Sequence, residues 1–341
     1  MNVYIDPNSY VHLGNTLFEE STTYNRNGCL KPYSYLRNYC GKRGIDLKTI
    51  DYWDGNKAGK GDVYVAFDHK NIGRKAYWKL KARNYPLADL DNFERKILFQ
   101  FEPPVVMPEI KFYLKTGAWF RVYDKVLFTS KMEDERYIYF HTPQAHEEVF
   151  PELWNNSERK FLTLINSNRK SFSRYKELLT ERVRAVAFFS ENSEIDLYGF
   201  DWDGLPIFPY WFHKKKIDKV YQGAVESKYK TLSNYDFALA YENCAMEGYI
   251  TDKIFDCFFT GTVPVYLGAT DIEKYIPKNC FIDMRKFNNY KDLRSHLKSL
   301  SRSEIKKYKE NARSFLESEA FKPFTKKRFA ELFVDIIKNG Q

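Results

Sequence analysis

Short runs of β-branched and aromatic residues recur along the first half of the chain, separated by polar stretches that can form helices or loops. Each run contains a continuous apolar stretch in its interior, which is the pattern of strands covered on both faces. Because such strands usually lie in a parallel sheet between layers of helices, the pattern predicts an α/β fold. The runs lie at Val3–Ile5, Asp62–Phe67, Lys96–Phe101 and Lys125–Thr129, and a helix is predicted at Pro32–Arg43.

The second half of the chain continues with β-α-β patterns. Phe161–Ser167 is predicted to be a strand, a helix is expected to run from an N-cap at Ser173 to Val186, and Ile195–Gly199 is the next strand. Further on, strands at Phe237–Tyr241 and Val263–Leu267 enclose a helix from Thr251 to Gly261, and the chain beyond Asn288 is mostly helical, with a break at Pro323.

The chain has 341 residues, which is more than a domain with a single hydrophobic core usually contains. This length predicts two domains. A polar stretch with prolines, His141–Ser157, interrupts the strand pattern and is typical of a domain boundary. We therefore predict an N-terminal domain over residues 1–155 and a C-terminal domain with a helical tail over residues 156–341.

Composition narrows the class of protein. Hydrophobic residues make up 43% of the chain and aromatic residues 18%, which is typical of a globular protein. The net charge of +9 favours anionic partners such as nucleic acid, a membrane surface or a phosphorylated substrate. Basic residues are interspersed with 45 acidic ones, and no nucleic-acid-binding motif occurs, so we expect no nucleic-acid partner. Peripheral association with an anionic membrane surface stays open.

Cysteine usage and hydropathy bear on the cellular compartment. The chain has five cysteines, an odd number, and no two of them form a C-x-x-C pair. The cysteine pattern therefore predicts neither a disulfide framework nor a zinc site. No stretch approaches the roughly 20 apolar residues that span a bilayer, and the first residues lack the features of a signal peptide. We expect a cytoplasmic protein.

Polar residues gather between the predicted strands Phe237–Tyr241 and Val263–Leu267. They lie at the end of the first strand, in the loop that follows it and at the start of the predicted helix. A helix N-terminus offers unpaired N–H groups and a partial positive charge, and Lys253 adds a full charge, so the pair can hold a pyrophosphate. Asp252 can accept hydrogen bonds from ribose hydroxyls, and Asn243 and Tyr249 can complete the contacts. An ordinary strand-loop-helix connection with solvated polar residues is the alternative.

The order of residues in this region is more specific than its composition. The chain reads YDFALAYENC at Tyr235–Cys244, GYITDK at Gly248–Lys253 and GTVPVYLG at Gly261–Gly268. Upstream it reads INSNRKSFSR at Ile165–Arg174 and IDLYGFDWDG at Ile195–Gly204. Together these segments resemble the α-1,3-fucosyltransferase family, glycosyltransferase family 10, over roughly Phe161 to Phe281.

The resemblance implies a GT-B-like α/β architecture, in which two Rossmann-like domains face a cleft. The C-terminal domain would bind the donor and the N-terminal domain the acceptor. The implied reaction is inverting transfer of fucose from GDP-fucose to a hydroxyl of an acceptor oligosaccharide of the N-acetylglucosamine or glucose type, in α-1,3 or α-1,4 linkage. The donor is a co-substrate, and we expect neither a cofactor nor an essential metal ion.

The same resemblance assigns roles to individual residues. Glu102, at the end of a predicted strand and before two prolines, is the expected general base on the acceptor side. Arg174 and Lys253 match the cationic positions that hold the diphosphate. Tyr221 and Lys228 stand at spacings similar to further donor contacts, with aromatic packing and a surface charge as their alternative roles. The expected donor-binding residues are Arg174, Tyr221, Lys228, Asn243, Tyr249, Asp252 and Lys253.

Departures from the family pattern keep other functions open. Asp252 stands where the family has glutamate, Asp236 where it has lysine, and Cys244 where it has serine. A transferase for a related GDP-deoxysugar, or a non-catalytic protein that binds nucleotide sugars or carbohydrates, is therefore the alternative. Asp201 and Asp203 also form a D-x-D pattern like that of metal-dependent transferases, which we expect to be a turn instead.

Overall fold

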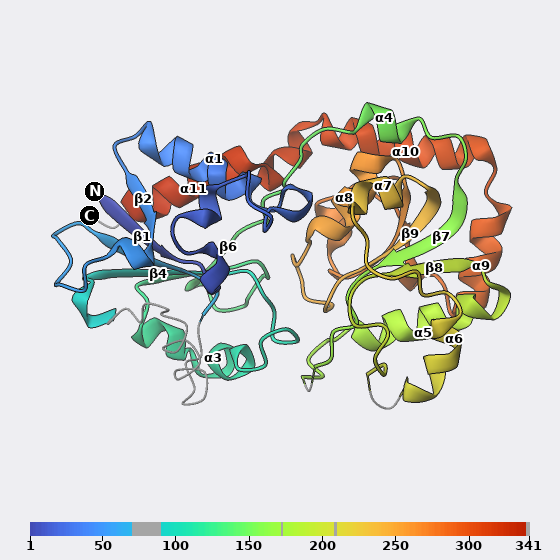
Figure 1. The fold of residues 1–341 in the computed structure, drawn as a ribbon, viewed down its shortest axis with the longest axis horizontal. Helices are drawn as coiled ribbons and strands as arrows, with labels where there is room; N and C mark the ends of the chain where they lie inside the picture. The colour runs from blue at the N-terminus through green and yellow to red at the C-terminus, as the bar shows by residue number, and fades with distance from the viewer. Residues whose placement is uncertain (70–89, 172, 208–209, 339–341) are drawn as a thin grey trace. The chain divides into compact units, whose positions relative to one another are not determined.

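The computed structural model describes residues 1–69, 90–171, 173–207 and 210–338. The chain divides into two compact units. Unit 1 comprises Met1–Ala145 with Pro323–Gln341, and unit 2 comprises His146–Lys322. Each unit is an α/β body with its own parallel sheet, so the predicted fold class is confirmed at this level (Figure 1).

Among the described residues, unit 1 contains a six-stranded sheet with the order β2-β1-β3-β4-β5-β6, in which every neighbouring pair is parallel. Its central strand β3 is apolar and buried along its whole length, and β4 is apolar and buried from Ile97 to Phe99, in agreement with the sequence pattern. The strands are β1 (Asn2–Asp6), β2 (Asp46–Thr49), β3 (Val63–Phe67), β4 (Arg95–Gln100), β5 (Lys125–Phe128) and β6 (Tyr137–Tyr139).

Two helices from opposite ends of the chain cover one face of this sheet. Helices α1 (Lys31–Gly41) and α11 (Lys326–Lys338) lie side by side there, and α3 (Ile110–Thr116) lies on the other face (Figure 1). The apolar side of α11 is buried in the core of unit 1, where Phe333 stacks on Phe99 of β4 with ring centroids 5.4 Å apart. Each such buried aromatic contributes roughly 1.5–3 kcal/mol to stability.

Unit 2 contains a five-stranded sheet with the order β11-β10-β9-β7-β8 in the part of the chain that the structure describes, again with parallel neighbours throughout. Helices α7, α8 and α10 lie on one face and α5 and α6 on the other (Figure 1). The strands are β7 (Lys160–Ile165), β8 (Ile195–Tyr198), β9 (Tyr235–Tyr241), β10 (Val263–Leu267) and β11 (Ile282–Asp283). The helices are α4 (Pro151–Trp154), α5 (Leu179–Phe189), α6 (Lys214–Asp218), α7 (Lys228–Leu232), α8 (Asp252–Thr260), α9 (Tyr290–Ser299) and α10 (Arg302–Leu316).

The division into units differs from the expected domains 1–155 and 156–341 in two places. Unit 2 begins at His146, ten residues before the expected boundary, because α4 packs against α8 and the Phe150 amide donates to the Phe259 carbonyl oxygen over 2.8 Å. The last helix, α11, belongs to unit 1 and not to the C-terminal unit. Its apolar face finds its partner on the first sheet, which the helical period alone does not reveal.

The predicted strands are confirmed, but one helix begins later than expected. Ser173 was expected to be an N-cap, whereas α5 begins at Leu179 and its first turn is held by Glu177, whose carboxylate accepts from the Thr180 amide over 3.0 Å. Lys176 has a positive φ of 49°, which is incompatible with a helix running through this point. The expected helix over 173–178 is therefore wrong.

Candidate functional site

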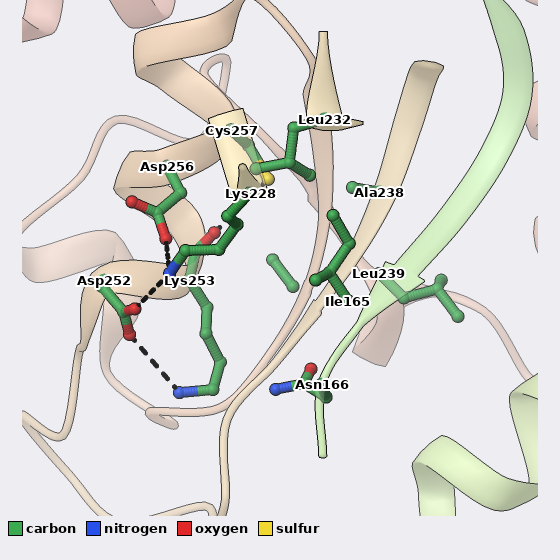
Figure 2. Close-up of a pocket in the computed structure, with 11 residues that line it drawn as sticks. Ile165, Asn166, Lys228, Leu232, Ala238, Leu239, Asp252, Lys253, Asp256 and Cys257 are labelled. Carbon is green, nitrogen blue, oxygen red and sulfur yellow. Dashed lines mark hydrogen bonds and ion pairs between the residues drawn. The ribbon is translucent and has the colours of Figure 1, made fainter. Parts of the chain in front are cut away.

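The carboxyl ends of β7 and β9 and the start of α8 surround a small cavity of about 100 Å³ in unit 2 (Figure 2). Parallel strands bring their carboxyl ends to one edge of the sheet, where open α/β folds usually bind ligands. The cavity is lined by five polar side chains, Asn166, Lys228, Asp252, Lys253 and Asp256, with an apolar wall that includes Leu232 and Cys257. Three of the predicted donor residues, Lys228, Asp252 and Lys253, are thus brought together.

The helix start at this cavity was predicted correctly, but the residue at the N-cap position does not cap the helix as expected. Thr251 occupies the N-cap position of α8, and Gly261 ends the helix with a positive φ of 63°. The Thr251 hydroxyl does not accept from a backbone N–H of the helix but donates to Oε2 of Glu242 over 2.8 Å. The N-terminal N–H groups of α8 therefore have no side-chain cap from Thr251.

Lys228 enters the cavity from α7 and contacts two carboxylates one turn apart on α8. Its Nζ lies 2.6 Å from Oδ2 of Asp252 and also pairs with Asp256. Burial disfavours the charged lysine, but both carboxylates favour it, and the pKa of Lys228 lies well above its usual value. Burial raises the pKa of Asp256 to about 7 against the opposing effect of Lys228. Asp256 was not among the predicted site residues.

Lys253 is held by the end of β9. Its Nζ lies 3.1 Å from Oε2 of Glu242 and donates to the Thr251 hydroxyl over 2.8 Å. Glu242 is fully buried, and its other oxygen accepts from the Thr251 amide over 2.8 Å. A buried carboxylate needs such a partner, so Glu242 fixes both the start of α8 and the direction of Lys253.

Gly268 explains part of the sequence pattern around this network. A Cβ at Gly268 would lie 2.5 Å from Cγ of Glu242 and would also collide with the Tyr266 hydroxyl. The Tyr266 hydroxyl accepts from the Ala269 amide over 3.0 Å, so it cannot easily move. Only glycine therefore fits beside the Glu242 side chain at the end of β10.

Arg182, which the sequence analysis did not single out, supports the site from α5. Its side chain is only 2% exposed and donates to the Tyr241 carbonyl oxygen over 2.7 Å and to Oδ1 of Asn243 over 2.9 Å. Burial lowers its pKa to about 10, while Glu242 opposes the shift. An arginine among the apolar residues of a predicted helix, LTERVRAVAFF, is the signal that could have identified it.

Two further predicted residues are buried and face each other. Asn243 Nδ2 donates to the Tyr249 hydroxyl over 3.4 Å, and these residues are 9% and 2% exposed. Because Arg182 also binds the Asn243 amide oxygen, Asn243 connects the buried arginine with the loop before α8.

The remaining donor candidates of unit 2 lie away from the small cavity. Arg174 lines a separate cavity of about 490 Å³ together with Lys170 and Trp211 and lies 3.4 Å from the Glu177 carboxylate. Tyr221 donates its hydroxyl proton to the Gly199 carbonyl oxygen over 2.9 Å. The structure therefore does not bring Arg174 or Tyr221 into the cavity that contains Lys253.

Glu102, the expected base, lies in unit 1, two residues beyond the end of β4. Its backbone N–H donates to Oδ1 of Asp68 over 2.8 Å, and its carbonyl oxygen accepts from Nε2 of Gln100 over 2.9 Å. The segment that contains Glu102 is thus fixed from both sides, and its side chain is half-buried.

The D-x-D pattern forms a turn. Asp201 has a positive φ of 65°, and the indole of Trp202, which is buried, donates to the Asn166 carbonyl oxygen over 2.5 Å. Among the described residues, no three His, Cys, Asp or Glu side chains are grouped so that they could hold a metal ion. No helix in the described ranges is long and apolar enough to cross a membrane.

The segment that contains this cavity is similar to known proteins. Residues 155–311 match the family model described as glycosyltransferase family 10 (fucosyltransferase) C-term. The chain is 39% identical over 69 residues to an α-(1,4)-fucosyltransferase of Arabidopsis thaliana, which is 20% of this chain and 17% of that protein. It is 34% identical over 76 residues to the α-(1,3)-fucosyltransferase FucT of Helicobacter pylori, which is 22% of this chain and 16% of that protein. The matches thus span less than a fifth of the length of these relatives.

The fold of the whole chain is similar to that of a solved α1,3-fucosyltransferase with GDP, with a TM-score of 0.56 and 14% sequence identity. That match covers 100% of this chain and 91% of the other chain. The two α/β units therefore have the fold of GT-B glycosyltransferases. Residues 155–311 thus match the C-terminal model of glycosyltransferase family 10, as the motifs in this segment indicated.

Proposed function

We propose that this protein transfers fucose from GDP-fucose to a hydroxyl of an acceptor glycan of the N-acetylglucosamine or glucose type, with inversion at the anomeric carbon. The observation that carries the proposal is the polar cavity at the start of α8, because it lies inside the segment that matches family 10. The two curated relatives described above are named as α-(1,4)- and α-(1,3)-fucosyltransferases, which supports fucose as the sugar and either position as the linkage.

The donor diphosphate would bind at the N-terminus of α8, beside Lys253 and Lys228. The N–H groups of a helix start and a lysine ammonium group are a combination that favours phosphate oxygens. Each lysine now contacts a carboxylate, so a diphosphate would replace one of these contacts with a phosphate oxygen. Asp252, which is half-exposed at its side chain, is free to turn toward a ribose hydroxyl when Lys228 contacts phosphate.

Charge balance around the cavity supports an anionic ligand at neutral pH. Lys228, Lys253 and the nearby Arg182 carry three positive charges, against the three carboxylates of Glu242, Asp252 and Asp256. Because burial raises the pKa of Asp256 to about 7, this carboxyl is partly protonated near neutral pH. The cavity then has a positive surplus that stabilises a departing diphosphate.

Glu102 would act from unit 1 as the general base. In a single displacement, the acceptor hydroxyl oxygen attacks the anomeric carbon opposite the diphosphate, and its proton passes to the Glu102 carboxylate. The carbon–oxygen bond to the diphosphate breaks in the same step, and the leaving group carries its charge to the lysines and the helix start. A metal ion is not required in this scheme, since the two lysines supply the positive charge.

Differential binding of nucleotides tests the proposal. GDP at saturating concentration should raise the melting temperature of the protein more than UDP does, because a ligand that binds only the folded state stabilises it by mass action. Incubation with GDP-fucose and galactosyl-β-1,4-N-acetylglucosamine should then release GDP and yield a fucosylated trisaccharide. Equal shifts with both nucleotides would contradict the donor assignment. GDP binding without turnover of GDP-fucose, alone or with this acceptor, would favour the non-catalytic alternative.

A further inference from the structure

Asp68 lies beside Glu102 because of the way two parallel strands pair. Asp68 directly follows β3, and β3 pairs with β4 up to the register position Phe67–Phe99. The Asp68 amide donates to the Phe99 carbonyl oxygen over 2.9 Å, which continues the ladder by one step. The Asp68 carboxyl group therefore reaches the backbone that follows β4, although it is 34 residues away from Glu102 in the sequence.

A single oxygen of Asp68 holds this backbone. Its Oδ1 accepts from the amides of Phe101 and Glu102, each over 2.8 Å, and from Nε2 of Gln100 over 2.7 Å. The same Nε2 of Gln100 donates to the Glu102 carbonyl oxygen over 2.9 Å. Both backbone groups of Glu102 are thus tied to one buried cluster, so the direction of its Cα–Cβ bond is restricted.

The cluster contains features that a simple loop connection does not need. Asp68 has a positive φ of 63°, which is unfavourable for most residues and tolerated by Asp and Asn. Burial and the nearby Glu102 raise the pKa of Asp68 to about 7. Gln100 is fully buried and also accepts from the His69 amide over 2.9 Å. Strain and buried polar groups of this kind gather where a structure holds a functional group in place.

We propose that Asp68 is a positioning residue for Glu102, which it holds in the direction required of the base through the Oδ1 hydrogen bonds and Gln100. This inference rests on the proposed function, since it assumes that Glu102 accepts the acceptor's proton. Asp68 itself contacts the backbone of Glu102 and has no chemical role in the transfer. Its effect on the reaction should therefore depend on the presence of the Glu102 carboxylate.

Replacement of Asp68 by glycine removes the carboxyl group and, because glycine adopts positive φ without strain, leaves the backbone conformation accessible. We expect kcat with GDP-fucose and galactosyl-β-1,4-N-acetylglucosamine to fall about 10- to 100-fold, the cost of a displaced catalytic group. The Kd for GDP should not change, since the donor cavity belongs to unit 2. Asp68→Asn keeps an oxygen acceptor, and asparagine tolerates the same φ. The kcat of Asp68→Asn should therefore be at least tenfold higher than that of Asp68→Gly.

Asp124→Ala is the matched control. Its carboxylate also accepts from a backbone amide of β4, that of Lys96 over 2.6 Å, but at the opposite end of the strand. It should lower the melting temperature and leave kcat unchanged. If Asp68→Gly does not fold, Gln100→Met removes the amide that binds both Asp68 Oδ1 and the Glu102 carbonyl oxygen. A smaller fall in kcat is then expected, because the direct bonds from the Phe101 and Glu102 amides to Asp68 remain.

The Glu102→Gln background separates this inference from the proposed function. If Asp68 acts through Glu102, adding Asp68→Gly to Glu102→Gln should cause no further loss of kcat. A further 10-fold or greater loss in that background, or normal kcat for Asp68→Gly alone, would overturn the positioning role. Normal kcat for Glu102→Gln would instead overturn the base assignment, whatever Asp68 does. Asp68→Ser has no planar acceptor at the same distance, so it should recover less kcat than Asp68→Asn does. Equal recovery by these two variants would also count against the positioning role.

Discussion

The ammonium group of Lys228 lies 2.6 Å from a carboxylate oxygen of Asp252, 24 residues further along the chain. This ion pair joins the short helix α7 to the first residue of α8 and places a second lysine at the helix start that already contains Lys253. Because of this contact, two lysine ammonium groups and the positive end of the α8 helix dipole lie at the same cavity.

Lys253→Met should weaken GDP binding at least 30-fold, or about 2 kcal/mol, because it removes a charge at the diphosphate position. The variant also leaves Glu242 buried without its ion pair, so its free energy of unfolding should fall. The double variant Lys253→Met/Glu242→Gln should recover stability but not GDP affinity. Titration calorimetry and thermal melts measure the two effects. Recovery of affinity in the double variant would mean that Lys253 supports the fold and does not bind the donor.

The family resemblance assigns Arg174 to the diphosphate although it lies outside the small cavity, so Arg174→Ala should reduce turnover of GDP-fucose about tenfold or more. The melting temperature should not fall, because this side chain is half-exposed. Arg184→Ala is the matched control, since Arg184 is also half-exposed and also pairs with a glutamate three residues away. The control should have normal turnover. Equal kinetics in the two variants would remove Arg174 from the donor site and would leave its 490 Å³ cavity without a role in transfer.

Glu102→Gln should lower kcat about 10²- to 10⁴-fold, because glutamine keeps the size of the side chain but cannot accept the proton. GDP affinity should hardly change. Glu109→Gln, seven residues further along in the same unit, is the control and should have normal kcat. A properly folded Glu102→Gln variant with normal turnover would contradict the base assignment, and a parallel loss of stability and GDP binding would indicate a structural carboxylate.

Turnover should survive treatment with EDTA, since the two lysines and the helix start supply the positive charge at the diphosphate. The initial rate of GDP release is measured before and after dialysis against the chelator. Addition of Mg²⁺ or Mn²⁺ should then cause no more than a twofold change. Complete loss of turnover that either metal restores would favour a metal-dependent mechanism instead.

The stability of the protein relative to Asp68→Asn should depend on pH. The folded pKa of Asp68 is raised to about 7 from a usual value of 3.8, so the native state holds this proton more tightly than the unfolded state. The stabilising effect is complete below about pH 4 and is lost as the pH rises through 7. The wild type should therefore lose stability relative to Asp68→Asn between pH 4 and 8, as urea melts can measure. A constant difference across this range would show that Asp68 is ionised throughout.

Much of the local structure follows from the sequence alone. The apolar runs predicted the longer strands, because a strand buried on both faces needs apolar residues at most of its positions. The segment from Tyr235 to Gly268 predicted a strand, a helix start with Lys253 and a second strand, because the capping position and the glycine at the C-cap are local features. The short edge strands β2, β6 and β11 escaped prediction, since two to four residues carry too little pattern.

The tertiary structure decided which distant groups meet. The period of α11 indicates an apolar face, but only the fold shows that this face packs on the sheet of unit 1 beside Phe99. The positions of Arg182 and Asp256 depend on where their helices lie against β9, and the contact of Asp68 with Glu102 depends on the register of β3 with β4. The physical reason is that propensity, capping and periodicity act within a few residues along the chain. Buried charges and polar groups are stabilised only by partners that the fold brings from elsewhere.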